Sequence, residues 1–167
     1  MYREKMQKRI EEAVMDLYET MYRIAITFAG NKEDAVTIVQ DSIYKAIQNT
    51  NQVKNERYIE TWLYKIVIYT AMEFQGKNQQ EIPFEELFHV CVKGREYDFQ
   101  DVDVNRVLDE LSEREKAVII LHFFEDKEIE EIAVILNANI STVKSLLYRS
   151  LNKMGIGMMG GKLQYGG

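Results

Sequence analysis

A polar stretch near the C-terminal end of the sequence carries side chains of the kinds that contact phosphates. No acidic residue occurs between Ile140 and Lys153, and the stretch contains the cations Lys144 and Arg149. At the helical repeat of about 3.6 residues, these two cations flank one polar face. That face consists of Ser141, Ser145, Tyr148 and Asn152. Hydroxyl, amide and cationic groups without acidic neighbours can contact a nucleic-acid backbone.

The residues around this stretch predict the two helices that would position it. Apolar residues at positions 129, 132, 133 and 136 recur with helical spacing, and Asn137 and Asn139 follow them. Because Asn tolerates left-handed backbone geometry and caps helices, these two residues predict a tight turn. The inward face of the second helix is predicted to be Ile140, Val143, Leu147, Leu151 and Met154. Two helices joined by such a turn are typical of a helix-turn-helix, whose second helix enters the major groove.

The rest of the chain also shows helical rather than alternating periodicity, and its single proline is Pro83. Apolar residues at helical spacing from Ile10 to Phe28 predict a long first helix that ends at Gly30. Asn31 is predicted to cap the helix that follows Gly30.

We therefore expect an all-α protein with two small helical domains. The predicted N-terminal domain spans residues 1–77, and the predicted C-terminal domain spans residues 102–154. In the latter, Ser112-Glu-Arg-Glu115 is a capping-box pattern ahead of an apolar helix. Residues 78–101 show no sustained period and are predicted to be a linker, and the Gly-rich residues 155–167 are predicted to be a flexible tail.

The composition limits the classes of function. The chain has 167 residues, a net charge of −6 and one cysteine, Cys91. One cysteine excludes an intramolecular disulfide. His89 and Cys91 could begin a zinc site, but zinc requires three or four ligands and the only other histidine, His122, falls in a predicted apolar helix, so no metal site is expected. No secretory signal or membrane-spanning run is recognisable, so we expect a cytoplasmic protein without membrane insertion. No catalytic constellation is recognisable either, so we expect neither enzymatic activity nor a cofactor.

Several segments resemble extracytoplasmic-function sigma factors, the small two-domain promoter-specificity subunits of bacterial RNA polymerase. Ser141-Thr-Val-Lys-Ser145 with Leu147-Tyr-Arg149 resembles their recognition helix, and Leu111 to Glu115 resembles the start of the promoter-binding domain. In the N-terminal half, Gly30 to Ala46 resembles the helix that docks on the polymerase clamp. Thr61-Trp-Leu-Tyr-Lys-Ile66 resembles the promoter-melting segment.

The resemblance implies a protein that binds core RNA polymerase and promoter DNA and directs promoter-specific initiation, with an anti-sigma protein as a further partner. Contacts with the −35 element are then expected from Asn139, Ser141, Thr142, Lys144, Ser145, Tyr148 and Arg149. Contacts with the −10 element are expected around a loop at residues 50–57 that would accept an extruded base, from Asn51, Lys54, Asn55, Arg57, Trp62 and Lys65. Polymerase contacts are expected from Asp34, Ile38, Val39, Gln40, Asp41 and Tyr44, with Ile38 or Val39 as an apolar anchor.

The chain also departs from the family pattern. Leu146 stands where an Arg is common in the recognition helix, and Ile68 and Tyr69 stand where arginines often follow the Trp-Leu motif. Few phosphate contacts and weak DNA binding by the free chain are therefore expected, since cations supply much of the affinity for DNA. The residues alone leave two alternatives open. One is a helix-turn-helix repressor or activator that acts without core polymerase, and the other is a helical interaction protein without DNA function.

Overall fold

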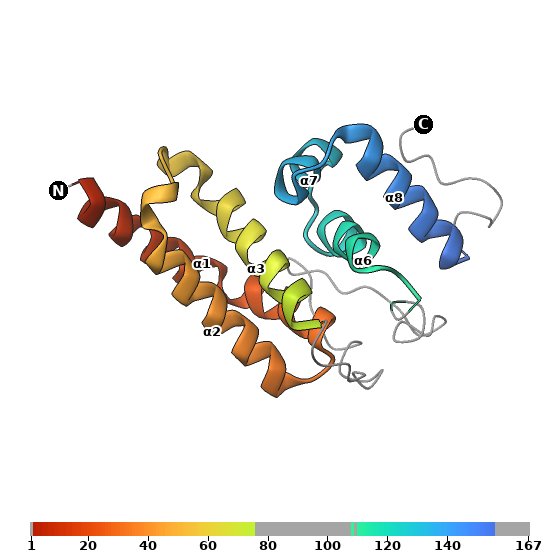
Figure 1. Cartoon of the computed structure of the whole chain (residues 1–167), viewed down its shortest axis with the longest axis horizontal. Coiled ribbons are helices and arrows are strands. Elements are labelled where there is room, and N and C mark those ends of the chain that lie inside the picture. The colour runs from red at the N-terminus through yellow and green to blue at the C-terminus, as the bar shows by residue number, and fades with distance from the viewer. Residues whose placement is uncertain (1, 76–107, 109, 156–167) are drawn as a thin grey trace. The chain divides into compact units, whose positions relative to one another are not determined.

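The computed structural model describes residues 2–75, 108 and 110–155, and the chain divides into two compact units, residues 1–82 and 83–167 (Figure 1). Every regular element of the described residues is a helix, which confirms the all-α expectation for this part of the chain. The predicted linker lies outside the described residues, as does the predicted tail after Gly155. The predicted domain boundaries therefore stay predictions.

Within the described residues, the first unit contains three α-helices, and each packs against the other two. They are α1 (Tyr2–Ala29), α2 (Lys32–Gln48) and α3 (Ile59–Gln75), drawn from red to yellow-green in Figure 1. The predicted boundary between α1 and α2 is confirmed. Gly30 has a positive φ of 91°, and the side chain of Asn31 accepts a hydrogen bond of 2.8 Å from the amide of Asp34. The cap thus satisfies one of the free amides at the start of α2.

The segment between α2 and α3 is more ordered than the irregular loop that its polar composition suggests. It forms two short 3-10 turns, η1 (Thr50–Gln52) and η2 (Glu56–Tyr58). Val53, between these turns, is only 4% exposed. It belongs to a buried cluster that draws on α1, α2 and α3, made of Met6, Ile10, Val14, Ala46, Val53, Ile59 and Leu63. The hydrophobic core therefore holds the middle of this segment in place.

The second unit contains α6 (Glu113–Ile119), which continues into a single π-helical turn, η3 (Ile120–Phe124). The capping box at its start is confirmed. The hydroxyl of Ser112 accepts from the amide of Glu115 at 3.2 Å, and Oε1 of Glu115 accepts from the amide of Ser112 at 2.9 Å. Two otherwise free amides are satisfied by this exchange.

The predicted helix-turn-helix is present as α7 (Ile129–Leu136) and α8 (Ile140–Lys153). Asn137 takes the left-handed conformation with φ of 55°, and Asn139 caps α8 by accepting from the amide of Thr142 at 2.8 Å. Both helices of the motif pack against one another, and α8 also packs against α6. Local signals in the sequence were therefore sufficient to place this turn.

The inward face of α8 differs from the prediction at one end. Val143, Leu147 and Leu151 are buried as expected, but Ile140 is 42% exposed, so its predicted inward position is wrong. Ile140 is the first residue of the helix and follows the exposed turn. The buried face is completed instead by residues on either side of the predicted stripe, Leu146 and Ser150.

Candidate nucleic-acid interface

The polar face of α8 is exposed, as its sequence predicts. Exposed positions along the helix are Ser141, Thr142, Lys144, Ser145, Tyr148, Arg149 and Asn152. Leu146, by contrast, is 7% exposed, which explains why an apolar residue is suited to that position. The exposure of the face is thus confirmed, and its contact with DNA stays a prediction.

Asn139 has a structural role that limits its availability for DNA. Its side-chain oxygen accepts from the amide of Thr142 and, at 3.0 Å, from the hydroxyl of Ser141. These bonds satisfy the first turn of α8 and direct the Ser141 hydroxyl toward the cap. The side-chain oxygen of Asn139 therefore holds the first turn of α8, where the recognition face begins.

The three cations of α8 differ in their surroundings. Lys144 is exposed and makes no ion pair with any residue that the structure describes. Arg149 and Lys153, in contrast, both pair with Glu115 at the start of α6. The Nε atom of Arg149 lies 3.4 Å from Oε2 of Glu115, and Nζ of Lys153 lies 2.8 Å from Oε1. One carboxylate therefore holds two of the three cations of α8, of which Arg149 is predicted to contact DNA.

Glu115 is only 2% exposed, so its ionisation depends on these contacts. Burial alone raises the pKa of its carboxyl group, but the hydrogen bonds from Lys153 and from the amide of Ser112 oppose this effect. Together with the positive charges of Lys153 and Arg149, they lower the pKa below its ordinary value of 4.5. Glu115 is therefore a carboxylate at neutral pH. The sequence revealed only its capping role, because its ionic partners lie far along the chain.

In the first unit, the residues predicted to contact the −10 element fall into two groups. Asn51, Lys54, Asn55 and Arg57 are exposed on the segment between α2 and α3. Trp62 is half-buried against the core cluster, and its Nε1 donates to Oε1 of Gln52 at 3.3 Å. This bond links α3 to η1, so Trp62 helps to hold the segment between α2 and α3 in place.

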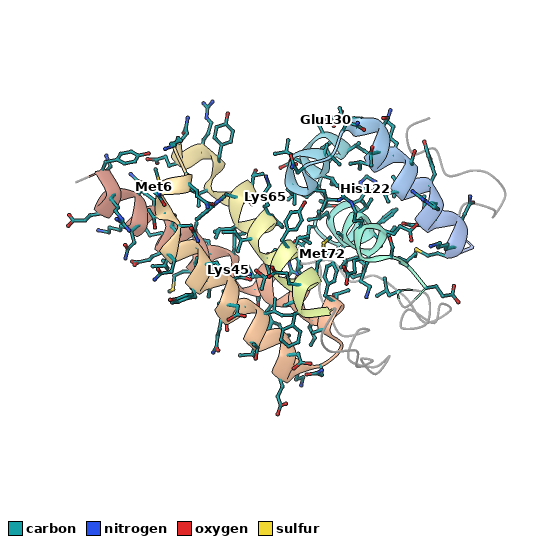
Figure 2. The ribbon with its side chains drawn as sticks, viewed as in Figure 1. Met6, Lys45, Lys65, Met72, His122 and Glu130 are labelled. Carbon is teal, nitrogen blue, oxygen red and sulfur yellow. The ribbon has the colours of Figure 1, made fainter. Side chains whose placement is uncertain are left out.

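An open cavity of about 230 Å³ lies where α2, η1 and α3 meet. Lys45 from α2 and Lys65 from α3 line it, and both side chains are labelled in Figure 2. The Nζ atom of Lys45 donates to the hydroxyl of Thr70 and to Oε1 of Glu73, both at 3.0 Å. The other lining residues are Asn49, Gln52, Ile66, Tyr69, Thr70 and Glu73.

The sequence prediction found only Lys65 among the residues of this cavity. A local signal was present, since Ile66, Thr70 and Glu73 share one face of α3 at helical spacing, as Lys45 and Asn49 do on α2. Nothing in the sequence, however, indicated that these two faces meet. Their meeting depends on how α2 packs against α3.

The predicted polymerase-contact surface on α2 needs a correction. Gln40 and Asp41 are exposed, and Tyr44 is 66% exposed, as expected. Ile38 and Val39 are both fully buried, so neither side chain can serve as the predicted apolar anchor. The reason is that α2 packs against both α1 and α3 and therefore buries a broad face. Tyr44 and the 37% exposed Val36 are the large apolar groups that α2 presents at the surface.

The described residues meet the requirements of neither a metal site nor a membrane-spanning helix. Across residues 2–75, 108 and 110–155, no group of three or more His, Cys, Asp or Glu side chains is placed to hold a metal ion. Within the same ranges, none of the helices has the length and apolar character needed to cross a bilayer. His89 and Cys91, for which no metal site is expected, lie outside this part of the chain.

Two solved structures share the fold of this chain. The sigma factor RpoE from Bartonella quintana, in complex with the anti-sigma factor NepR, gives a TM-score of 0.65 at 21% identity and covers 86% of this chain and 92% of that chain. CnrH, in complex with the cytosolic domain of CnrY, gives a TM-score of 0.69 at 17% identity and covers 92% of this chain and 89% of that chain.

Sequence comparisons give the family. Residues 102–154 match the family described as sigma-70, region 4. RNA polymerase sigma-E factor from Streptomyces avermitilis is 24% identical over 149 residues, covering 86% of this chain and 82% of that protein. RNA polymerase sigma factor SigV from Bacillus subtilis is 41% identical over 144 residues, covering 86% of this chain and 87% of that protein. At this identity over most of both chains, the protein belongs to the sigma-70 family of RNA polymerase sigma factors, in the extracytoplasmic-function group that its motifs indicated.

Proposed function

We propose that the chain binds core RNA polymerase and directs promoter-specific initiation of transcription. In this role α8 reads the −35 element, and the first unit reads the −10 element. The observation that carries the proposal is the exposed, acid-free face of α8 in a chain related to SigV over 86% of its length. A relation of that extent favours this function over a repressor or activator that acts without core polymerase.

The contacts of α8 with DNA divide into two kinds. Lys144 has no ionic partner among the described residues and is suited to a phosphate contact, which positions the helix without reading sequence. Ser145 and Tyr148 lie on the exposed face between the flanking cations and are suited to base edges. The face therefore combines a charge that has no ionic partner among the described residues with the polar groups of Ser145 and Tyr148.

The cavity between α2 and α3 is the proposed site for an extruded promoter base. Its volume of about 230 Å³ is below the roughly 300–1,000 Å³ of pockets for larger small molecules, so it suits a single planar ring. Tyr69 offers an aromatic face for stacking, and Asn49 and Gln52 offer donors and acceptors for a base edge. Lys65 adds a cation beside the neighbouring backbone phosphates.

The exposed side of α2 is the proposed contact with the polymerase. Gln40 and Asp41 supply polar groups, Asp34 lies at the start of the helix, and Tyr44 supplies a large exposed aromatic side chain. Interface energy concentrates in a few residues, among which Tyr is enriched. Tyr44 therefore replaces Ile38 and Val39 as the proposed apolar anchor.

We also infer an anti-sigma partner and a non-catalytic role. Both solved structures named above are complexes with a second protein: the sigma factor RpoE is bound to the anti-sigma factor NepR, and CnrH is bound to the cytosolic domain of CnrY. The relatives named above are sigma factors, and the described residues contain no metal-holding group.

The test is transcription with core RNA polymerase from Bacillus subtilis, the source of SigV. Promoters are first selected from random duplexes by the reconstituted holoenzyme and then transcribed with each element scrambled in turn. Lys144→Ala is expected to lower transcripts that depend on the upstream element. Tyr69→Ala is expected to slow promoter opening about fivefold to a hundredfold, the range set by stacking of one base. If the folded chain yields no promoter-dependent transcript with this core, the proposal is wrong.

A further inference from the structure

Glu115 connects the start of α6 to the C-terminal half of the recognition helix. Its Oε1 accepts from the amide of Ser112 and from Nζ of Lys153, and its Oε2 faces Nε of Arg149. The carboxylate is almost completely buried, whereas the side chains of Arg149 and Lys153 are 57% and 39% exposed. A single buried anion thus anchors two cations whose outer parts reach the surface.

We infer that Glu115 is a positioning residue for DNA recognition. It holds Arg149 so that only the outer edge of the guanidinium meets DNA, and it withholds Lys153 from the phosphates. This inference rests on the proposed function of α8. It gives Glu115, a residue of α6, a part in promoter discrimination. The sequence patterns assign that role to α8 alone.

Geometry supports the restraint on Arg149. A guanidinium has five N–H donors in a fixed fork, and the Nε edge is the one that approaches Glu115. The remaining Nη donors can bind a phosphate or a base edge in a defined orientation. Lysine could not do both, because an ammonium is a compact point charge without a second, oriented edge.

Burial explains why DNA does not simply displace Glu115. Removing both cations would leave a buried carboxylate with only the amide of Ser112 as a partner and no opposite charge, which is strongly unfavourable in a medium of low polarity. A phosphate must therefore share Arg149 with Glu115 instead of replacing it. The two cations and the carboxylate together present a net charge of +1, where two free cations would present +2.

This charge balance predicts a change in specificity. Attraction to phosphates is independent of sequence and depends on the number of cations available. By neutralising one charge and orienting another, Glu115 lowers non-specific affinity and preserves the specific contact. Loss of its charge should therefore strengthen binding to any duplex while reducing preference for the promoter.

Glu115→Gln separates this role from capping, because Gln also forms the capping box at this position of a helix. The matched control is Glu113→Gln, which removes the same charge from the same turn of α6 at an exposed residue. The probes are labelled duplexes that carry the upstream element selected by the wild-type holoenzyme, and scrambled duplexes of equal length. Fluorescence anisotropy with the full chain, over a series of salt concentrations, gives affinities and salt slopes.

For Glu115→Gln we expect tighter binding to the scrambled duplex and a salt slope steeper by up to about one phosphate equivalent. The ratio of selected to scrambled affinity should fall severalfold. Glu113→Gln should leave that ratio at the wild-type value. Equal ratios and slopes in the two variants would overturn the inference, as would a proportional loss of binding to both duplexes. A wild-type holoenzyme that selects no promoter would instead overturn the proposed function, so the two failures are distinguishable.

A second variant covers the case in which Glu115→Gln does not fold. Arg149→Lys changes an exposed side chain and keeps its charge, so the salt slope should stay at the wild-type value. The selected-to-scrambled ratio should nevertheless fall severalfold, because the ammonium cannot engage Glu115 and present an oriented edge. An unchanged ratio would contradict the positioning role.

Discussion

The hydroxyl of Tyr2 donates a hydrogen bond of 2.9 Å to the carbonyl oxygen of Lys54, which joins the first residue of α1 to the segment between α2 and α3. Arg9 and Glu56 form an ion pair of 3.7 Å between the same two parts of the chain. In the core, Met6 and Val53 belong to the same buried cluster. The start of α1 therefore supports the segment proposed to read the −10 element.

Tyr2→Phe is predicted to slow promoter opening while leaving capture by core polymerase unchanged. The expected effect is below about tenfold, since a net hydrogen bond contributes about 0.5–1.5 kcal/mol. Permanganate reactivity of the melted promoter, followed over time with holoenzyme, measures this rate. Tyr18→Phe, at an exposed position of the same helix, is the control. Identical rates for both variants would remove the proposed support role of Tyr2.

Two sets of substitutions on α2 separate its core face from its proposed contact surface. Ile38→Ala is expected to lower the free energy of unfolding by about 2–5 kcal/mol, because it removes a fully buried side chain. Gln40→Ala with Asp41→Ala should change stability by less than about 1 kcal/mol yet weaken binding to core polymerase, since both residues are exposed. Thermal melts and core-capture assays give the two quantities. Undiminished core affinity of the double variant would exclude this surface from the interface.

Substitution of individual α8 cations should show which of them reaches DNA phosphates. Lys144→Ala is expected to reduce the salt slope of duplex binding by about 0.9, the value for one phosphate contact. Lys153→Ala should reduce it less, because the ammonium of Lys153 lies 2.8 Å from the buried carboxylate of Glu115. Anisotropy titrations at several salt concentrations measure both slopes. A larger effect of Lys153→Ala would mean that the assignment of the two lysines is reversed.

The lowered pKa of Glu115 predicts a specific acid dependence of stability. Since the pKa is lower in the folded than in the unfolded chain, the carboxylate stabilises the fold fully above its ordinary value of 4.5. This contribution declines as the pH falls below that value and is lost when the folded carboxyl becomes protonated. The difference in melting temperature between wild type and Glu115→Gln should therefore shrink on acidification. Glu113→Gln serves as the reference, and a difference that stays constant with pH would rule out the ionic contribution.

The sequence by itself determined the ends of several helices and the exposed face of α8. Asn31, Asn139 and the Ser112–Glu115 capping box act within one helical turn, so their effects can be read from adjacent residues. The same holds for Asn137, whose left-handed conformation ends α7. The motifs also indicated the family, which the 41% relation to SigV confirms.

Only the tertiary structure decided which residues of these helices are exposed for contact with DNA or with the polymerase. Ile38 and Val39 belong to a family-like motif, yet both are buried because α2 has two neighbouring helices to pack against. The cavity between α2 and α3 exists only where two helical faces meet. Likewise, Glu115 holds Arg149 because α6 packs against α8. Periodicity describes one helix at a time, whereas burial and ion pairing between distant residues depend on how separate helices pack.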